Sequence, residues 1–186
     1  MQISFIDISR AYFNAQTNED HPAYVELPPE DPDYGSGLCG RLNVHMYGTR
    51  AAADGWHCEY SGSMEEAGFN VGQSSACVFA HKGKHLLCSV HGDDFTTVGP
   101  KSSLDWFVKQ LMTKYELKES ARLGPATEDE KEARVLNRIV RWTTEGVEYE
   151  ADPRQSEKLI QELGLEGCRV VTTPATKATA EQCNSD

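Results

Sequence analysis

Two adjacent aspartates, Asp93 and Asp94, are the residues whose type and spacing best suit them to chemistry. They follow the apolar run Leu86–Val90, a histidine and a glycine, and a strand-like pattern resumes at Phe95–Val98. Two short β-type segments around a Gly-Asp centre predict a hairpin whose tip carries two carboxylates. Such a tip holds divalent metal ions when a third carboxylate reaches it from elsewhere in the fold. Gly and Asp are also favoured in turns for conformational reasons, which leaves a purely structural interpretation open.

The candidate for the third carboxylate is Asp7. It ends the alternating, β-branched segment Ile3–Asp7, which predicts a strand. The end of a strand is a position from which a carboxylate can face the tip of a neighbouring hairpin. The alternative interpretation of Asp7 is a turn or capping acid. Directly after it, Ser9 offers an N-cap for a short turn through residues 10–14.

The elements that must position these acids are mixed α and β, with largely antiparallel strands. A helix at 51–67 carries the stripe Trp56, Tyr60 and Met64, which we interpret as core. Ser102 or Ser103 caps a second, amphipathic helix. The other expected elements are a strand at 41–44, hairpins at 77–90 and 135–150, a helix at 153–163, and loops at 17–37 and 122–133.

Length and composition bound the classes of protein this chain can belong to. Its 186 residues suffice for one domain with a core, with or without a small appendage. The net charge of −11 argues against a surface that wraps nucleic acid, although it leaves room for a local basic groove. Six cysteines without a CxxC pair do not suggest a zinc site. With no secretory signal and no long apolar run, we expect an intracellular protein, cytoplasmic or nuclear, and no membrane partner.

Several segments, in order along the chain, resemble the copia-type LTR retrotransposon reverse transcriptases. Residues 6–15, Ile-Asp-Ile-Ser-Arg-Ala-Tyr-Phe-Asn-Ala, resemble the first catalytic motif of these enzymes, and residues 91–94 resemble their Tyr-X-Asp-Asp box. Further matching blocks lie at 25–29, 39–42, 46–50, 68–69, 75–79, 155–159, 163–165 and 173–174. The resemblance runs from about residue 3 to residue 177 in unbroken order, which is far more specific than any one motif.

The resemblance implies an α+β fold: a reverse-transcriptase palm-like antiparallel sheet backed by helices and truncated at its N-terminus. It implies a palm-like catalytic core at residues 1–120, a thumb-like or connection-like segment with a hairpin and a helix at 121–171, and a disordered tail at 172–186. It also implies an RNA or DNA template-primer and deoxynucleoside triphosphates as partners, together with other parts of the retrotransposon polyprotein.

The implied reaction is two-metal nucleotidyl transfer. Nucleotide addition uses two Mg²⁺ ions about 3.5–4 Å apart, one activating the primer 3′-oxygen and one holding the triphosphate and leaving group. We expect Asp7 and Asp93 to bridge the two ions and Asp94 to act as the auxiliary carboxylate. Mn²⁺ is the alternative cofactor.

The resemblance also assigns residues to the substrates. It implies that Arg10 and Ala11 offer backbone N–H groups to the triphosphate, and that Tyr12 is the aromatic gate that rejects a ribose 2′-hydroxyl. An ordinary core aromatic is the other interpretation of Tyr12. The residues expected to contact template and primer are Arg50, His91 and Gly92.

Three departures from the family pattern limit the functional expectation. The family's Gln-Ala-Pro-Arg run is replaced by Ala51–Asp54, which puts a negative charge where the family has a positive one. Gly92 takes the place of a larger residue in the acidic box. Because Asp7 follows Met1 closely, we expect the family's fingers region to be absent, and we likewise expect no ribonuclease H after the tail. Loss of such positive groups around a phosphate lowers the rate by orders of magnitude.

Three hypotheses therefore remain. The chain is an RNA-directed DNA polymerase module that needs another chain or a longer polyprotein to supply fingers, or it is a catalytically inactive retroelement remnant that binds little nucleic acid. A third possibility is another metal-dependent palm enzyme, such as a nucleotide cyclase, which uses similar acids on a related hairpin. The blocks outside the acids disfavour this third hypothesis, because they resemble copia-type elements.

Overall fold

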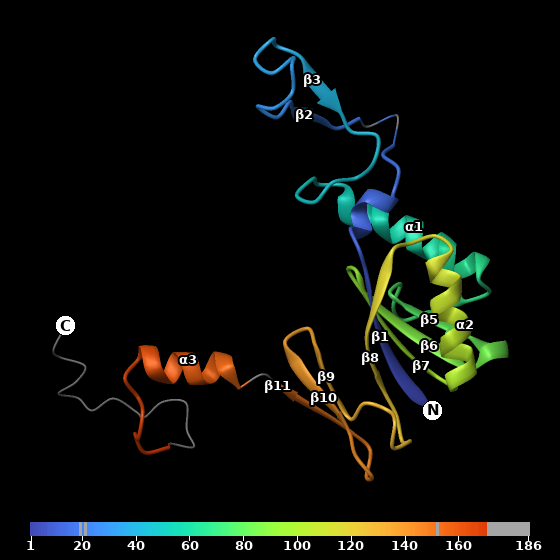
Figure 1. The fold of residues 1–186 in the computed structure, drawn as a ribbon, viewed down its shortest axis with the longest axis vertical. Coiled ribbons are helices and arrows are strands. Elements are labelled where there is room, and N and C mark those ends of the chain that lie inside the picture. Colours follow the sequence, from blue (N-terminus) through green and yellow to red (C-terminus); the bar gives the residue numbers. More distant parts are fainter. Residues whose placement is uncertain (19, 21, 152, 171–186) are drawn as a thin grey trace. The chain divides into compact units, whose positions relative to one another are not determined.

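The computed structural model describes residues 1–18, 20, 22–151 and 153–170 (Figure 1). The chain divides into two compact units, residues 1–150 and residues 151–186. The described part of the second unit contains the helix α3, Arg154–Glu162, which follows Pro153 as the sequence predicts. The predicted tail at 172–186 lies outside the described residues.

The first unit is built on a six-stranded antiparallel sheet in the order β4-β5-β6-β7-β1-β8. Its strands are β1 Gln2–Ile8, β4 Asn70–Val71, β5 Val78–His81, β6 Leu86–His91, β7 Asp94–Gly99 and β8 Leu117–Leu123. A second sheet has the order β11-β10-β9, with β9 Glu132–Val135, β10 Arg138–Trp142 and β11 Val147–Ala151. A two-stranded sheet pairs β2 Tyr24–Glu26 with β3 Cys39–Arg41.

Helices α1, Ala52–Glu66, and α2, Lys101–Met112, cover one face of the large sheet (Figure 1). The predicted stripe of Trp56, Tyr60 and Met64 is confirmed as core, because all three side chains are buried beneath α1. Phe95 and Phe107 are completely buried in the same cluster. Burial of each such side chain contributes about 1.5–3 kcal/mol. This cluster fixes α1 against the strands that carry the acids.

The opposite face of β1 is also buried, against the second sheet. Ile3 and Phe5 pack with Ala121 and Leu123 of β8, and with Ala133 and Val140 of the β9–β10 hairpin. Strand β1 therefore has apolar neighbours on both faces, which explains why nearly all of its residues are buried, including the polar Gln2 and Ser4. Only Asp7 breaks this run of buried residues.

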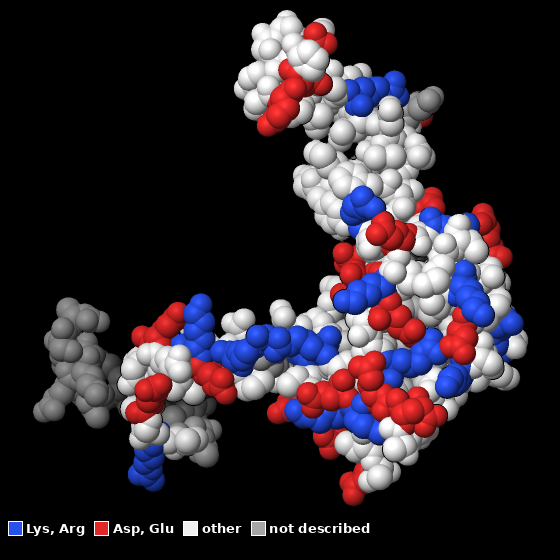
Figure 2. Space-filling model, viewed as in Figure 1, with Lys and Arg blue, Asp and Glu red and all other residues white. Residues whose placement is uncertain are grey.

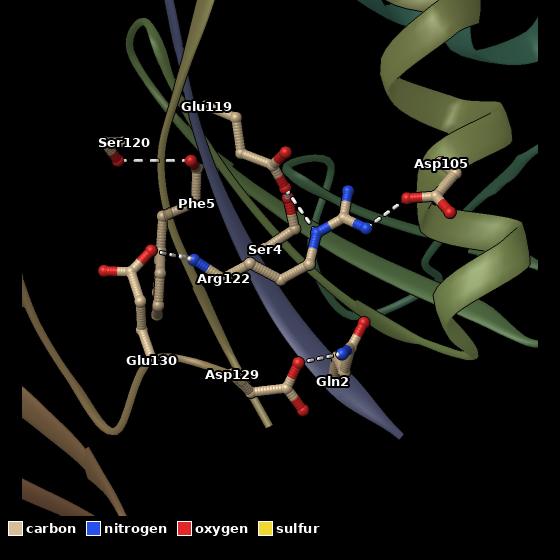
Figure 3. Close-up of polar contacts among 9 residues, drawn as sticks. All are labelled: Gln2, Ser4, Phe5, Asp105, Glu119, Ser120, Arg122, Asp129 and Glu130. Atoms are coloured by element: carbon tan, nitrogen blue, oxygen red, sulfur yellow. Dashed lines mark hydrogen bonds and ion pairs between the residues drawn. The ribbon is translucent and has the colours of Figure 1, made fainter. Parts of the chain in front are cut away.

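A polar network holds the beginning of β1 to β8 and α2 (Figure 3). Arg122 of β8 forms ion pairs with Glu119 and with Asp105 of α2, and Glu119 accepts a 2.6 Å hydrogen bond from the Ser4 hydroxyl. Nearby, the Gln2 amide donates to Asp129 at 2.6 Å. These contacts join three elements around the first half of the central strand.

The predicted fold class is confirmed as mixed α+β with a large antiparallel sheet, and several boundaries differ from expectation. The expected loop at 122–133 contains the end of β8 and the start of β9. The hairpin expected at 135–150 has its first strand only from Arg138, because residue 135 ends β9 and a turn follows at Leu136 and Asn137. The strand expected at 41–44 lies instead at Cys39–Arg41. None of the helices formed by described residues is both long and apolar enough to cross a bilayer.

The predicted helix caps are wrong at two positions. The first residue before α2 is Pro100, so neither Ser102 nor Ser103 caps the helix with its side chain. At the end of β1, the 3₁₀ turn η1, Ala11–Asn14, is preceded by Arg10 in the left-handed conformation instead of a capping Ser9. Proline fixes a suitable φ at a helix start without any side-chain hydrogen bond.

Candidate functional site

The acidic turn joins β6 to β7 through two residues, Gly92 and Asp93. His91 and Asp94 are the facing pair that closes the hairpin. Gly92 has φ +64°, and a Cβ added there would meet nothing within 4 Å. Conformation, not space, therefore requires glycine, as is typical of two-residue hairpin turns with a positive φ at the first position. The hairpin predicted from the Gly-Asp centre is confirmed.

Two hydrogen bonds from other elements hold the backbone of this turn. The Ile8 N–H of β1 donates to the Asp93 carbonyl at 3.0 Å. The Trp56 indole Nε1–H of α1 donates to the Gly92 carbonyl at 2.8 Å. Because Trp56 is 1% exposed, its ring is fixed by the core and transmits that rigidity to the turn. The acids are thus carried by a turn attached to both the central strand and the helix.

Asp7 and Asp94 face each other across neighbouring strands. Ile8 of β1 and Phe95 of β7 belong to the core beneath the helices, so strand alternation places both aspartates on the opposite face of the sheet. Directly opposite residues of an antiparallel pair have Cβ atoms about 4.5–5.5 Å apart. Lys118 of β8 is the partner of Asp7 on its other side. The register therefore brings together Asp7 and Asp94, with Asp93 on the adjoining turn.

The charges of Asp93 and Asp7 act on the carboxyl group of Asp94. Burial, followed by the charges of Asp93 and Asp7, raises the pKa of Asp94, while His91 acts in the opposite direction. A raised pKa in a carboxyl group means that the folded protein disfavours its charged form. Like charges placed directly opposite in a sheet destabilise it. The acidic turn consequently retains an unfavourable repulsion between the carboxylates around Asp94.

The donor chemistry of the turn fits a hard divalent cation, since carboxylate oxygens are the ligands that Mg²⁺ and Mn²⁺ prefer. Within the described parts of the chain, no three acidic, histidine or cysteine side chains already converge at metal-ligand spacing. All three aspartates are only partly buried, so their carboxylates can rotate without disturbing the core. The repulsion at Asp94 is relieved by positive charge of any kind, including a bound cation.

The residues expected to bind nucleotide follow β1 directly and lie around η1. Arg10 has φ +53° and pairs with Glu116 on the surface, while Ala11 is buried. Tyr12 is partly buried and packs against the edge of the helix-covered core. Its ring centroid lies 4.4 Å from that of Tyr47. Both interpretations of Tyr12 thus have support, since the ring touches the core and remains partly accessible.

The residues expected to contact template and primer are only partly brought together. His91 and Gly92 are exposed on the acidic turn. Arg50 is exposed in the turn before α1, and none of the contacts between described residues joins it to the acids. Asp54, which replaces a basic residue of the family pattern, is exposed on the first turn of α1.

Two further features of the site were not predicted from the sequence. Tyr47, in the segment before α1, makes a tilted ring contact with the nucleotide-binding candidate Tyr12, and the β9–β10 hairpin lies beside Asp94 of β7. A cavity of about 60 Å³ is lined by Asp94 together with Arg134 and Leu136 of that hairpin. Leu136 and Asn137 have φ +49° and +60°, which identifies the tight hairpin turn. Asn137 was a usable signal for this turn, whereas leucine rarely adopts such a φ.

The family comparison agrees with this geometry. A family model described as "Reverse transcriptase (RNA-dependent DNA polymerase)" matches residues 1–177. The match covers the central strand, the acidic turn, both helices of the first unit and the β9–β11 sheet. It includes the segments that resemble copia-type enzymes, and that resemblance is confirmed. The chain therefore belongs to the reverse transcriptase family, in its copia-type branch.

Proposed function

We propose that this chain is the RNA-directed DNA polymerase part of a copia-type retrotransposon polyprotein. The observation that carries the proposal is the pairing of Asp7 with Asp94 beside Asp93, inside a family match that covers almost the whole chain. In the proposed reaction, the primer 3′-hydroxyl gives up its proton to water, and its oxygen forms a bond to the α-phosphorus of a deoxynucleoside triphosphate. The bond to the β-phosphate oxygen breaks, and pyrophosphate leaves.

In this proposal, Asp7 and Asp93 hold two Mg²⁺ or Mn²⁺ ions and Asp94 is an auxiliary carboxylate. When bound, the ions would lower the pKa of the primer hydroxyl and neutralise charge on the phosphates. The protein contributes the rigid placement of its carboxylates. The bonds from Ile8 and Trp56 to the turn serve this purpose, because a displaced ligand loses much of its effect.

The substrate-binding roles are assigned to the residues around this turn. The backbone of Arg10 and Ala11 contacts the triphosphate, and Tyr12 lies under the sugar, where its ring excludes a 2′-hydroxyl. His91 and Gly92 contact the primer end, with the β9–β10 hairpin beside Asp94 as a further surface for the strand. Arg50 contacts the template.

The negative charge of this chain favours a polymerase that needs a second, basic component to bind nucleic acid. The chain has a net charge of −11, and acidic side chains alternate with basic ones over the face shown in Figure 2. Nucleic-acid affinity depends on Lys and Arg that neutralise phosphates. Other parts of the polyprotein, or a second chain, would supply the additional basic surface. We place the palm-like core at residues 1–120 and the connection-like segment at 121–171.

A catalytically inactive remnant is the second candidate function. The replacement of a basic run by Ala51–Asp54, with Asp54 exposed at the start of α1, favours it specifically. Such a protein would retain the acidic turn but would bind its substrates only weakly.

A primer-extension assay distinguishes an active polymerase from a catalytically inactive remnant. The full chain is given an RNA template, a DNA primer, deoxynucleoside triphosphates and Mg²⁺, and is compared with Asp93→Asn. We expect the substitution to reduce extension at least about 100-fold, the effect of losing one key electrostatic group. Asp33→Asn, an exposed loop acid, is the matched control and should keep full activity. Equal extension by wild type and Asp93→Asn would refute the proposal, and no extension by wild type would favour the remnant.

A further inference from the structure

Tyr47 packs against two aromatic residues of the segment that follows β1. Its ring lies 4.4 Å from Tyr12 in a tilted arrangement and 5.9 Å from Phe13 edge to face. Such aromatic pairs contribute about 0.5–1.5 kcal/mol beyond simple burial. Tyr47 nevertheless remains 45% exposed, which is unusual for a ring with two aromatic partners and indicates a position at the rim of a site.

The Tyr47 hydroxyl has polar neighbours in the segment that follows β1. It lies against the backbone of Ala11 and Tyr12, and close enough to Asp93 to respond to its charge. Burial and then Asp93 raise the pKa of this phenol, whereas the two backbone groups lower it. One side chain from the segment between β3 and α1 therefore contacts the gate candidate Tyr12 and lies within electrostatic range of Asp93.

Tyr12 has two packing partners. It packs against the helix-covered core, and its ring also contacts that of Tyr47. A side chain that excludes a small group by contact must be fixed in position, because a ring that can turn away no longer excludes it. The core buries Tyr12 only partly, so Tyr47 supplies an additional contact that restricts its ring.

We propose that Tyr47 is a positioning residue that holds Tyr12 against the sugar, so that discrimination between deoxyribose and ribose depends on both rings. This inference rests on the proposed function, because it needs a nucleotide bound at the acidic turn. It assigns to Tyr47 a role in selectivity and none in the chemical step. Removal of its ring should therefore change the preference between two nucleotides more than the rate of incorporation of the preferred one.

The test compares dUTP with UTP, which differ only in the 2′-hydroxyl. The full chain is bound to an RNA template and a dideoxy-terminated primer with Mg²⁺, and the dissociation constant of each nucleotide is measured. For wild type we expect dUTP to bind more tightly. Tyr47→Ala should reduce the ratio of the two constants about tenfold, by strengthening UTP binding. Tyr47→Phe keeps the ring and should restore most of the ratio.

Controls separate positioning from folding. Tyr34→Ala removes a tyrosine of similar exposure, 49%, from a different loop and should leave the ratio unchanged. A purely structural role for Tyr47 would weaken both nucleotides equally, so an unchanged ratio in Tyr47→Ala overturns this inference while leaving the proposed function intact. Absence of nucleotide binding in wild type overturns the proposed function, and this inference with it.

Discussion

The two ends of strand β1 differ in how their charges are arranged. At its beginning, Ser4 joins a network in which Arg122 pairs with two carboxylates (Figure 3). Burial lowers the pKa of Arg122, and its bonds to these carboxylates more than offset that effect. At its end, Asp7 faces Asp94 next to Asp93, and the pKa of Asp94 is raised. One end is electrostatically complementary, and the other concentrates like charges.

The charges at the beginning of β1 stabilise the strand, whereas the charges at its end are the groups that it presents for function. Complementary pairs with good geometry stabilise a fold, whereas repulsion among partly buried acids weakens it. Sites of chemistry commonly retain such unfavourable arrangements because the function needs them. The beginning of β1 thus anchors the sheet, and its end presents reactive groups from that anchored position.

The largest effect on stability is expected at the anchoring end. Arg122→Met keeps the length of the side chain and removes both ion pairs, leaving Glu119 and Asp105 without their cation. We expect the free energy of unfolding to fall by about 1–3 kcal/mol, as for other hydrogen bonds to charged groups. Chemical denaturation followed by circular dichroism measures this change.

Arg141→Met is the matched control for this variant. Arg141 also pairs with two carboxylates, those of Glu132 and Glu150, but its side chain is more exposed. Exposed pairs contribute little, so its loss should be clearly smaller. An equal loss in both variants would show that the anchoring network has no special importance.

The anchoring end was poorly predicted from the sequence. Strand β8 has polar residues at most positions, and the sequence predicted no strand there, only a loop from residue 122. Its polar residues are accommodated by partners that are distant in sequence, such as Ser4 and Asp105. Local periodicity carries no information about such partners, and tertiary context decides. Glycine and aspartate at the turn, by contrast, have conformational preferences that can be read locally.

A smaller effect is expected from the backbone of the acidic turn. Gly92→Ala places a side chain at φ +64°, and we expect a loss of about 1–2 kcal/mol in the free energy of unfolding. Gly62→Ala in α1 is the control, because that position is open and helical. It should gain about 0.5–1 kcal/mol. Thermal unfolding of both variants tests the contrast, and a stabilising Gly92→Ala would contradict the conformation of the turn.

The acidic residues of the candidate site were proposed from the sequence, whereas the contacts that hold them in place were not. Asp7, Asp93 and Asp94 were identified from type and family resemblance, yet the register that pairs Asp7 with Asp94 depends on the alignment of strands. The hydrogen bond from Trp56 to the turn was also unpredicted, because the stripe that identifies Trp56 as core says nothing about its indole N–H. Contacts made by Tyr47 arise in an irregular segment without periodicity.

The smallest change in stability bears most directly on the central claim that the acidic end weakens the fold and is suited to a cation. In EDTA at neutral pH, Asp94→Asn should be more stable than wild type by about 0.2–1 kcal/mol, because it removes the repulsion. The pKa of Asp94 is raised above its ordinary 3.8, so wild type loses stability as pH rises through the range above that value. The advantage of the variant should therefore shrink as pH falls toward 3.8.

The decisive measurement is chemical denaturation of wild type and Asp94→Asn, each in EDTA and in Mg²⁺. Mg²⁺ that binds only the folded state raises the free energy of unfolding with its concentration. We predict that Asp94→Asn is the more stable protein in EDTA, and that Mg²⁺ stabilises wild type more than the variant. A less stable variant in EDTA, or an equal response of both proteins to Mg²⁺, would contradict the account.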